Sequence, residues 1–365
     1  MASNKNQHYV PQCYLRQFSV SDTGSSINLF NIDRKKFIQG APIKNQCSKS
    51  YFYGDDLTLE KAFQPTEGQY SSILKQIKSA GYKLSEEHRE FLKCFWLLQY
   101  LRTEAASRRD IELTEGMNEA IGDKAYAYRL EMKEAVQESI AKFPKVIETL
   151  TDLKVCLINN KTALDFITSD DPAVLTNRWY FQDARTKGMS FGLSSAGNLL
   201  LLPLTDKILM LGYDGNVYNA SHKNGWVNMT NQADVKAINE HQLLNCRANV
   251  FVRNPEHATH VADLFDAVKV NKPRLRHKIN YAIFDGIGNN GDEHFKVADK
   301  EQFRKHEKSL MHCQVINASP RMWPSVLQWR LKGFAYFNNS GAGYIRQAAA
   351  FGKANASEFK KVKIR

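Results

Sequence analysis

The hydrophobic pattern of the chain changes near Asp152. Between residues 57 and 150, apolar side chains recur at the three- and four-residue spacing of helices. After Asp152, short apolar runs end in Asn, Asp, Pro or Gly, which is the pattern of strands separated by turns. We therefore predict an α+β protein in which a mostly helical N-terminal block packs with a mixed, mostly antiparallel sheet.

The strongest helical segment is SEEHREFLKCFWLLQYLRTEAASRR, residues 85–109. It begins with a serine cap followed by acidic residues and has basic residues near its end, an arrangement that suits the helix dipole. Its apolar side chains cover more than one face, which predicts a central position. Upstream, Pro65 interrupts the helical pattern of residues 57–80 and predicts two short helices. A further helix is expected over residues 125–143.

The sheet is expected to form from the short apolar runs after Asp152. The predicted strands are KVCLIN, ALDFITSD, KGMSFGL, GNLLLLPLT and KILMLGYDG. Two helices, near residues 232–246 and 257–270, flank a further strand, NVFVR. The hydrophobic pattern of the sequence is less regular after residue 271. We expect three units with these boundaries: 1–153, 154–295 and a basic, aromatic-rich C-terminal extension, 296–365.

The composition indicates a globular protein of the cytoplasm. Apolar residues make up 43% of the chain, enough to offset the conformational entropy of folding. No run reaches the roughly 18 to 20 apolar residues of a membrane-spanning helix, and the first residues lack the apolar core of a signal peptide. The six cysteines are widely spaced, which favours reduced thiols. We expect no membrane contact, and the oligomeric state stays open.

Positive charge concentrates in residues 301–365. The chain carries a net charge of +12, and this segment holds 12 Lys and Arg residues against 3 acidic residues. Basic side chains alternate there with aromatic rings, a combination that neutralises phosphates and stacks on bases. The same rings would equally serve as core, and many basic tails bind nothing in particular. The residues expected to contact a nucleic acid are Arg321, Arg330, Lys332, Arg346, Lys353, Trp323, Trp329 and Tyr344.

The segment FITSDDPAVL places carboxylates at the end of a predicted strand. Rigid backbone would hold Asp170 there, directed toward a ligand or a hard divalent cation such as Mg²⁺ or Mn²⁺. The alternative is structural, with Asp170 capping a turn that Pro172 sets. Taken by itself, the segment favours the cap.

Further candidates for a site lie earlier in the chain. Glu60 and Glu67 lie seven residues apart, which would be two helical turns on one face if Pro65 did not intervene. Folding would bring them close to His8 or Asp170 to form a metal site. Lys49 lies between two serines in SKSYFYG and would offset charge on a phosphate. The alternatives are a solvated helix face for the two glutamates and an ordinary surface lysine. Motifs of P-loop, Rossmann, zinc-protease and nucleophile-elbow enzymes are absent from the sequence.

Three segments follow one another along the chain: HYVPQCYLRQF near its start, then FITSDDPAV, then LLPLTDKILML. In this order, they resemble the first signature, the second signature and the segment that follows in a bacterial family labelled only as domain of unknown function 4238. The resemblance covers roughly residues 6–252, and the residues beyond about 300 look like an addition. The motif positions are His8, Pro11, Tyr14, Leu15, Phe18, Asp170, Pro172, Pro203 and Leu204.

The resemblance carries no established activity, but it strengthens a joint role for His8 and Asp170. Our first hypothesis is a metal-assisted phosphodiesterase acting on nucleic acid, with a defence-type role by association with bacterial and phage accessory genes. His8 would be base or ligand, Asp170 with Glu60 or Glu67 would hold the cation, and Lys49 would contact the phosphate. The alternatives are a non-catalytic nucleic-acid-binding or sensor protein, and a hydrolase or transferase acting on a phosphorylated small molecule.

Overall fold

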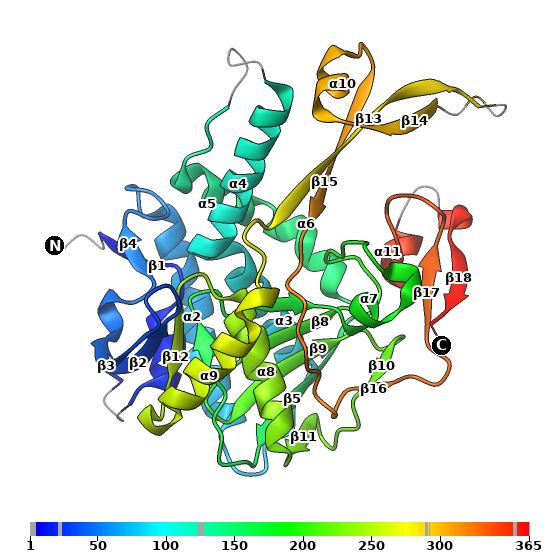
Figure 1. Cartoon of the computed structure of the whole chain (residues 1–365). Coiled ribbons are helices and arrows are strands. Elements are labelled where there is room, and N and C mark those ends of the chain that lie inside the picture. The colour runs from blue at the N-terminus through cyan, green and yellow to red at the C-terminus, as the bar shows by residue number, and fades with distance from the viewer. Residues whose placement is uncertain are drawn as a thin grey trace.

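The computed structural model describes residues 5–20, 24–122, 128–288, 291, 293–352 and 356–364. A central sheet lies between helices, and a long twisted hairpin projects from one end of the molecule (Figure 1). Helices and strands are both abundant, and most strand pairs are antiparallel, so the prediction of an α+β fold with a mixed, mostly antiparallel sheet is confirmed.

The central sheet has five strands. Within this sheet, the β11–β5 pair is parallel, and the other three pairs of neighbouring strands are antiparallel. In spatial order, the strands are β11 (Trp226–Met229), β5 (Lys154–Asn160), β9 (Ile208–Tyr213), β8 (Leu199–Pro203) and β7 (Val174–Thr176).

Both faces of the central sheet are buried. Successive side chains of a strand point to opposite faces, and in β5 Leu157 packs with the N-terminal helices while Ile158 packs on the other side with α8 (Gln232–Asn245). Every residue of β8, LLLLP, is buried for this reason. The strands therefore lack the alternation of apolar and polar residues that a half-exposed sheet shows.

The helical block on one face is built around α3 (Glu86–Arg102). Ser85 caps this helix by accepting a hydrogen bond from the backbone N–H of His88. Trp96 is fully buried and donates to the carbonyl of Leu201 in the sheet, at 3.2 Å. The other helices of the block are α2 (Thr58–Ile77), α4 (Glu104–Ile121), α5 (Met132–Ala141) and α6 (Phe143–Ile147).

Three details of this block and sheet differ from the sequence predictions. Helix α2 runs unbroken through Pro65, because its buried face, including Tyr70, outweighs the lost backbone hydrogen bond. The segment KGMSFGL forms turns and loop, not a strand. The helix predicted over residues 85–109 is two helices, because the backbone of Thr103 is extended and caps a new helix, α4.

A second sheet lies beside the first, and its strand β6 belongs to the second signature segment, FITSDDPAV. Helices α8 and α9 (Ala258–Val268) pack on it through Phe30, Leu243 and Val250. In spatial order, its strands are β3 (Lys36–Pro42), β2 (Ser26–Asn31), β12 (Asn249–Val252) and β6 (Thr168–Ser169). The N-terminal segment adds the pair β1 (Asn6–His8) and β4 (Ser48–Ser50) and the short helix α1 (Gln12–Leu15).

The projecting hairpin, called the arm below, comprises residues 277–315. It contains β13 (His277–Ile287), β14 (Glu293–Ala298), α10 (Lys300–Lys305) and β15 (Ser309–Val315). Its strands form a three-stranded sheet, and it contacts α4 through β13 and α10. The boundary predicted between residues 295 and 296 therefore falls inside β14. The boundary predicted at 153 and 154 coincides with the start of β5.

The remaining C-terminal elements return to the body of the molecule. They are short strands and one short helix that pack on the central sheet and on the loop after β7. These elements and their partners are α7 (Arg178–Gln182), β10 (Tyr218–Asn219), β16 (Gln328–Trp329), β17 (Phe334–Phe337), α11 (Gln347–Phe351) and β18 (Lys360–Lys363). In the described part of the chain, no helix is long and apolar enough to cross a membrane.

Candidate functional site

The three signature segments meet at one buried hydroxyl group. Tyr14 donates from its Oη to the carbonyl of Pro203 and lies 2.6 Å from the hydroxyl of Thr168. Each of these residues belongs to a different signature, and Tyr14 is fully buried. The hydrogen bonds therefore fasten the N-terminal motif to both sheets.

The junction between α3 and α4 consists of Arg102, Thr103 and Glu104, and all three are buried. Arg102 donates to the backbone carbonyl of His8 at 2.8 Å and to the Glu67 carboxylate at 3.0 Å. Its guanidinium also lies 4.3 Å from the centre of the Phe63 ring. The N-terminal motif is thus held by a buried charge whose counter-charge is Glu67.

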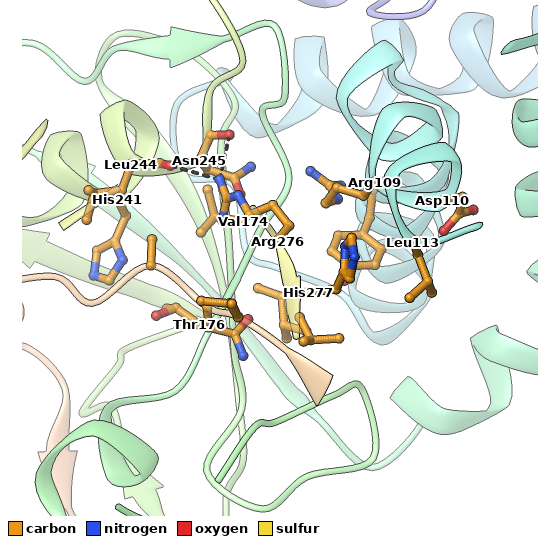
Figure 2. Close-up of a pocket in the computed structure, with 16 residues that line it drawn as sticks. Arg109, Asp110, Leu113, Val174, Thr176, His241, Leu244, Asn245, Arg276 and His277 are labelled. Carbon is orange, nitrogen blue, oxygen red and sulfur yellow. Dashed lines mark hydrogen bonds between the residues drawn. The ribbon is translucent and has the colours of Figure 1, made fainter. Parts of the chain in front are cut away.

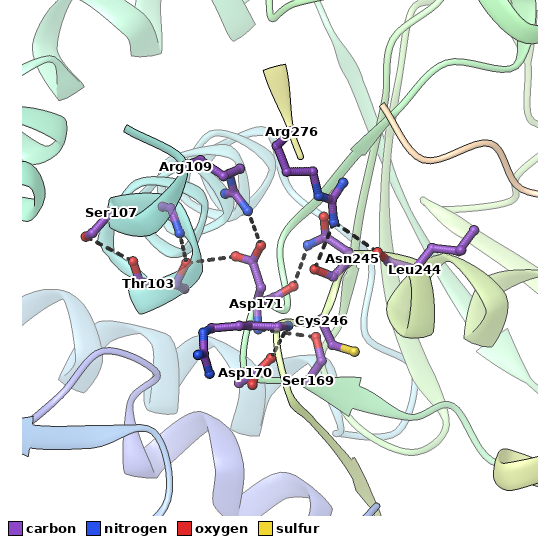
Figure 3. Close-up of polar contacts among 12 residues, drawn as sticks. Thr103, Ser107, Arg109, Ser169, Asp170, Asp171, Leu244, Asn245, Cys246 and Arg276 are labelled. Carbon is purple, nitrogen blue, oxygen red and sulfur yellow. Dashed lines mark hydrogen bonds and ion pairs between the residues drawn. The ribbon is translucent and has the colours of Figure 1, made fainter. Parts of the chain in front are cut away.

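Thr103 connects the junction to the second signature segment. Its hydroxyl donates to Asp171 Oδ1 at 2.8 Å and accepts from the backbone N–H of Ala106, which caps α4. The other oxygen of Asp171 accepts from Arg109 at 2.6 Å (Figure 3). Asn245 donates to the Asp171 carbonyl at 2.7 Å. Asp171 is fully buried, so these contacts satisfy a charge that water does not reach.

Asp170, next to it, binds backbone rather than side chains. Its two oxygens accept from the N–H groups of Arg247, Ala248 and Asn249 at 2.7 to 2.9 Å. This role resembles the structural alternative, except that Asp170 caps the loop before β12 and not its own turn. Burial raises the pKa of Asp170 to about 6, although the three N–H groups act in the opposite direction.

Titration of Asp170 makes a testable contribution to stability. Its pKa is about 6 in the folded protein against an ordinary value of 3.8, so the folded state binds more protons between these pH values. The contribution is present below about pH 4 and is lost as the pH rises through 6, by about 3 kcal/mol at most. In urea unfolding from pH 4 to 7, the wild type should lose stability relative to Asp170→Asn as the pH rises. Parallel stability curves for the two proteins would contradict this.

A pocket of about 200 Å³ opens beside the Asp171 network (Figure 2). Arg109 enters it from α4 and Arg276 from the segment that leads into the arm. The lining comes from α3, α4, β7, α8 and both roots of the arm. Its residues are Tyr100, Arg109, Asp110, Leu113, Val174, Leu175, Thr176, His241, Leu244, Asn245, Arg276, His277, Val315, Ile316, Asn317 and Ala318.

The two arginines differ in their counter-charges. Arg109 is paired with Asp171, whereas Arg276 donates to the carbonyls of Leu244 and Asn245 at the end of α8. Within the described residues, the Arg276 guanidinium forms no ion pair with a carboxylate. Burial lowers the pKa of Arg276, the positive charge of Arg109 lowers it further, and the Asp171 carboxylate acts in the opposite direction. The pocket therefore holds a positive charge that an anion would stabilise.

His241 adds a neutral polar group to the lining. It is 3% exposed, and its Nε2 has no hydrogen-bond partner among the described residues. Burial lowers the pKa of His241 to about 3, so the ring is neutral at physiological pH. Its side packs edge-on against Trp323, at 5.0 Å between ring centres. A buried nitrogen without a partner in a pocket is an available donor or acceptor for a ligand.

The catalytic residues predicted from sequence are distributed over two sides of the junction. Arg102 contacts both the backbone carbonyl of His8 and the Glu67 carboxylate. Burial raises the pKa of Glu60, although the charge of Arg102 acts in the opposite direction. Lys49 pairs with Glu104 at 2.8 Å. The ring of His8 lies 3.2 Å from the carbonyl of Lys44. The predicted residues thus surround the α3–α4 junction.

The expected metal centre is not assembled. Among the residues that the structure describes, no group of three or more His, Cys, Asp or Glu side chains is placed to hold a metal ion. The physical reason is that both oxygens of Asp170 accept from backbone N–H groups, and Glu67 is paired with Arg102. Glu60, the other expected ligand, lies on α2 near Glu67 and Arg102.

Two of the predicted nucleic-acid contacts are wrong. Arg346 is 1% exposed and binds Asp152 and three backbone carbonyls, so it cannot reach a phosphate. Tyr344 is 7% exposed, stacks on Phe337 and is a core residue. Both belong to the alternative in which the aromatic and basic residues of the extension build a core.

The other residues predicted in the extension are at or near the surface, apart from Lys353, which lies outside the described residues. Trp323 packs on His241 and Phe181, and Trp329 packs on Tyr218. The basic side chains Arg321, Arg330 and Lys332 are exposed. Two of them have protein partners, since Arg321 lies 3.7 Å from Glu240 and Arg330 donates to the carbonyl of Gly215.

Sequence reasoning missed the residues of the pocket. Arg109 was expected only as a basic residue near a helix end, and Arg276 and His241 were not candidates. One local signal existed for α4, because Thr103 within an otherwise strong helix is a preferred N-cap residue. Nothing in the local sequence connects Arg276 to Arg109, which is 167 positions earlier in the chain.

Comparison with known proteins identifies one family. A family model described as "Protein of unknown function (DUF4238)" matches residues 6–256. No curated protein and no solved structure matches the chain. The matched region contains the body of the molecule up to β12, and it ends before the arm.

Proposed function

Because the chain belongs to the DUF4238 family, whose description assigns no activity, we propose a function from the pocket itself: it binds a small molecule that carries a phosphate group. The observation that supports this most directly is the convergence of Arg109 and Arg276, from distant parts of the chain, on one pocket. Guanidinium groups bind phosphate oxygens through paired, charge-assisted hydrogen bonds.

The charges around the pocket favour an anion. Arg276 has no carboxylate partner among the described residues, and it is repelled by Arg109. The carboxylate at the rim, Asp110, accepts from Ser139 and lies 3.9 Å from Lys142. A bound phosphate would offset the charge of Arg276, which lacks the carboxylate partner that Arg109 has in Asp171. Thr176 and the neutral ring of His241 would supply further hydrogen-bonding groups.

The size of the pocket favours a small ligand. Pockets for drug-sized molecules are usually about 300 to 1,000 Å³, and this one measures about 200 Å³. Its walls include Leu113, Val174 and Leu244 beside the polar groups. This suits inorganic phosphate or the phosphorylated end of a compact metabolite or nucleotide better than a stretch of nucleic acid.

We propose binding rather than metal-assisted cleavage. The carboxylates that a phosphodiesterase of this kind would use are already engaged, Asp170 by three backbone N–H groups and Glu67 by Arg102. The hypothesis of an enzyme acting on a phosphorylated small molecule requires the binding step proposed for the pocket.

Removal of Arg276 should weaken phosphate binding. The variant Arg276→Ala loses a charge-assisted contact of about 1.5 to 3 kcal/mol, which raises the Kd about ten- to a hundredfold. The measurement is isothermal titration calorimetry of the full chain with inorganic phosphate and with a nucleoside monophosphate. The two titrations distinguish a bare phosphate site from one that also recognises the attached group.

The matched control is Arg274→Ala, which removes an exposed arginine two positions away in the same segment. It should leave the Kd unchanged. An equal loss of phosphate affinity in both variants would show that the effect comes from the overall charge of the protein and not from the pocket. Absence of binding of either phosphate compound to the wild-type protein, at millimolar ligand, would overturn the proposal.

A further inference from the structure

We propose a second binding site, separate from the pocket: the surface formed by Lys49, Arg108 and Arg247 binds the backbone of single-stranded nucleic acid. This site is independent of the proposed small-molecule function. It also differs in position from the C-terminal residues expected from sequence, two of which are buried.

Three cationic groups surround a single oxygen atom. Lys49 Nζ, Arg108 Nε and Arg247 Nε lie 2.8, 2.7 and 3.8 Å from Glu104 Oε1. One carboxylate therefore faces three positive charges, which leaves an excess of two. Lys49 comes from β4, Arg108 from α4 and Arg247 from the loop after α8, so the cluster is set by the fold and not by one run of basic residues.

The cations are accessible while their carboxylate is not. The side chains of Lys49, Arg108 and Arg247 are 42%, 47% and 42% exposed, whereas that of Glu104 is 8% exposed. The buried Glu104 carboxylate thus contacts the basic groups on their inner side, while the rest of each basic group is exposed to solvent. Burial opposes ionisation of Glu104, but hydrogen bonds from Lys49 and Arg108 lower its pKa, so the carboxylate stays charged and positioned.

An exposed ring follows Lys49 in the chain. Tyr51 is 38% exposed and stands two residues beyond Lys49, with Lys5 Nζ placed 5.8 Å from the centre of its ring. Its backbone N–H donates to the carbonyl of Lys5, which fixes the ring-bearing segment against the N-terminal strand. An accessible aromatic ring therefore belongs to the same chain segment as one cation of the cluster, and proteins combine such rings and charges to hold unpaired bases and their phosphates.

Single-stranded nucleic acid fits this combination better than other polyanions. An acidic peptide or an anionic membrane would use the charges but not the ring, and the bases of a duplex are already stacked on one another. The excess of two positive charges predicts a slope of about −1.4 for the logarithm of affinity against the logarithm of salt concentration, at about 0.7 per neutralised phosphate.

The test is fluorescence anisotropy of the full chain with a labelled single-stranded oligonucleotide over a salt series. The double variant Lys49→Gln, Arg108→Gln keeps hydrogen-bond donors to Glu104 and removes two charges. It should reduce affinity at low salt by about tenfold or more and reduce the salt slope by about 1.4. Thermal unfolding of each variant is recorded alongside, and Lys49→Arg should retain binding.

If the double variant fails to fold, Arg247→Gln alone carries the test, because Arg247 makes the longest of the three contacts; it should lower the slope by about 0.7. The charge-matched control is Lys332→Gln, on the exposed extension, which should change neither value. Equal losses in Lys332→Gln and Arg247→Gln would overturn the proposal. Equal affinity for poly-glutamate or for duplex would also overturn it.

Each proposal has its own diagnostic variant. Arg276→Ala should leave oligonucleotide binding intact, and Arg247→Gln should leave phosphate binding intact. Replacing the ring by Tyr51→Ala should weaken single-strand binding about fivefold or more through the loss of stacking, without changing the salt slope. A slope that changes with Tyr51→Ala would place the ring's role in charge and contradict stacking.

Discussion

Replacing Asp171 with Ala should lower the free energy of unfolding by about 3 to 5 kcal/mol, because it removes one partner of a buried ion pair. Asp171 is fully buried, and its two oxygens accept from the Thr103 hydroxyl and from Arg109. In Asp171→Ala, the Arg109 guanidinium loses its counter-charge and the cap of α4 loses its partner. Urea unfolding followed by far-ultraviolet circular dichroism measures the change.

Two companion variants sharpen this result. Asp171→Asn keeps an acceptor for Thr103 while removing the charge, so its loss should be smaller than that of Asp171→Ala. Asp263→Ala removes an exposed carboxylate on α9 and should change stability by less than about 0.5 kcal/mol. A loss below about 1 kcal/mol for Asp171→Ala would show that solvent reaches Arg109 and replaces the ion pair.

Replacing Arg346 with Ala should cost a similar amount, about 3 to 5 kcal/mol. Its Nε lies 3.0 and 3.1 Å from the two oxygens of Asp152, and its Nη1 donates to the carbonyls of Leu193 and Ser195. The side chain is 1% exposed, so the carbonyls have no water to replace the lost donors. The variant should release the C-terminal strands β17 and β18 from the loop after β7.

Limited proteolysis together with urea unfolding measures this change. Cleavage within residues 334–364 should become faster in Arg346→Ala than in the wild type, while β5 to β9 stay protected. Arg346→Lys retains the charge but not the planar fork and should recover only part of the stability. Lys332→Ala, in the same extension but exposed, serves as the control. Wild-type proteolysis rates in Arg346→Ala would contradict an anchoring role.

The fold was predictable where one local pattern decided the structure. Alternating turn residues and apolar runs located β5, β8 and β9, and Ser85 marked the start of α3. Local patterns failed where tertiary contacts outweighed them. Pro65 did not end α2 because packing of its buried face compensates, and Thr103 ended α3 because Asp171, 68 positions away, holds its hydroxyl.

The candidate site was less predictable for the same reason. The three signature segments were recognisable in the sequence, but that Tyr14 joins them through one hydroxyl group is visible only in the folded chain. The position of Asp170 was informative but its partners were not, because backbone N–H groups have no identity in a sequence. The charge cluster around Glu104 depends on three separate segments of the sequence that only folding brings together.

The roots of the arm have one further consequence. The family match ends at residue 256, whereas Arg276, His277 and residues 315–318 form one side of the pocket. The pocket is therefore a composite, with one wall from the shared body and the other from sequence outside the match. Under the proposed function, exchanging the arm and its roots should change the ligand preference while leaving the core, the signatures and the α3–α4 junction as they are.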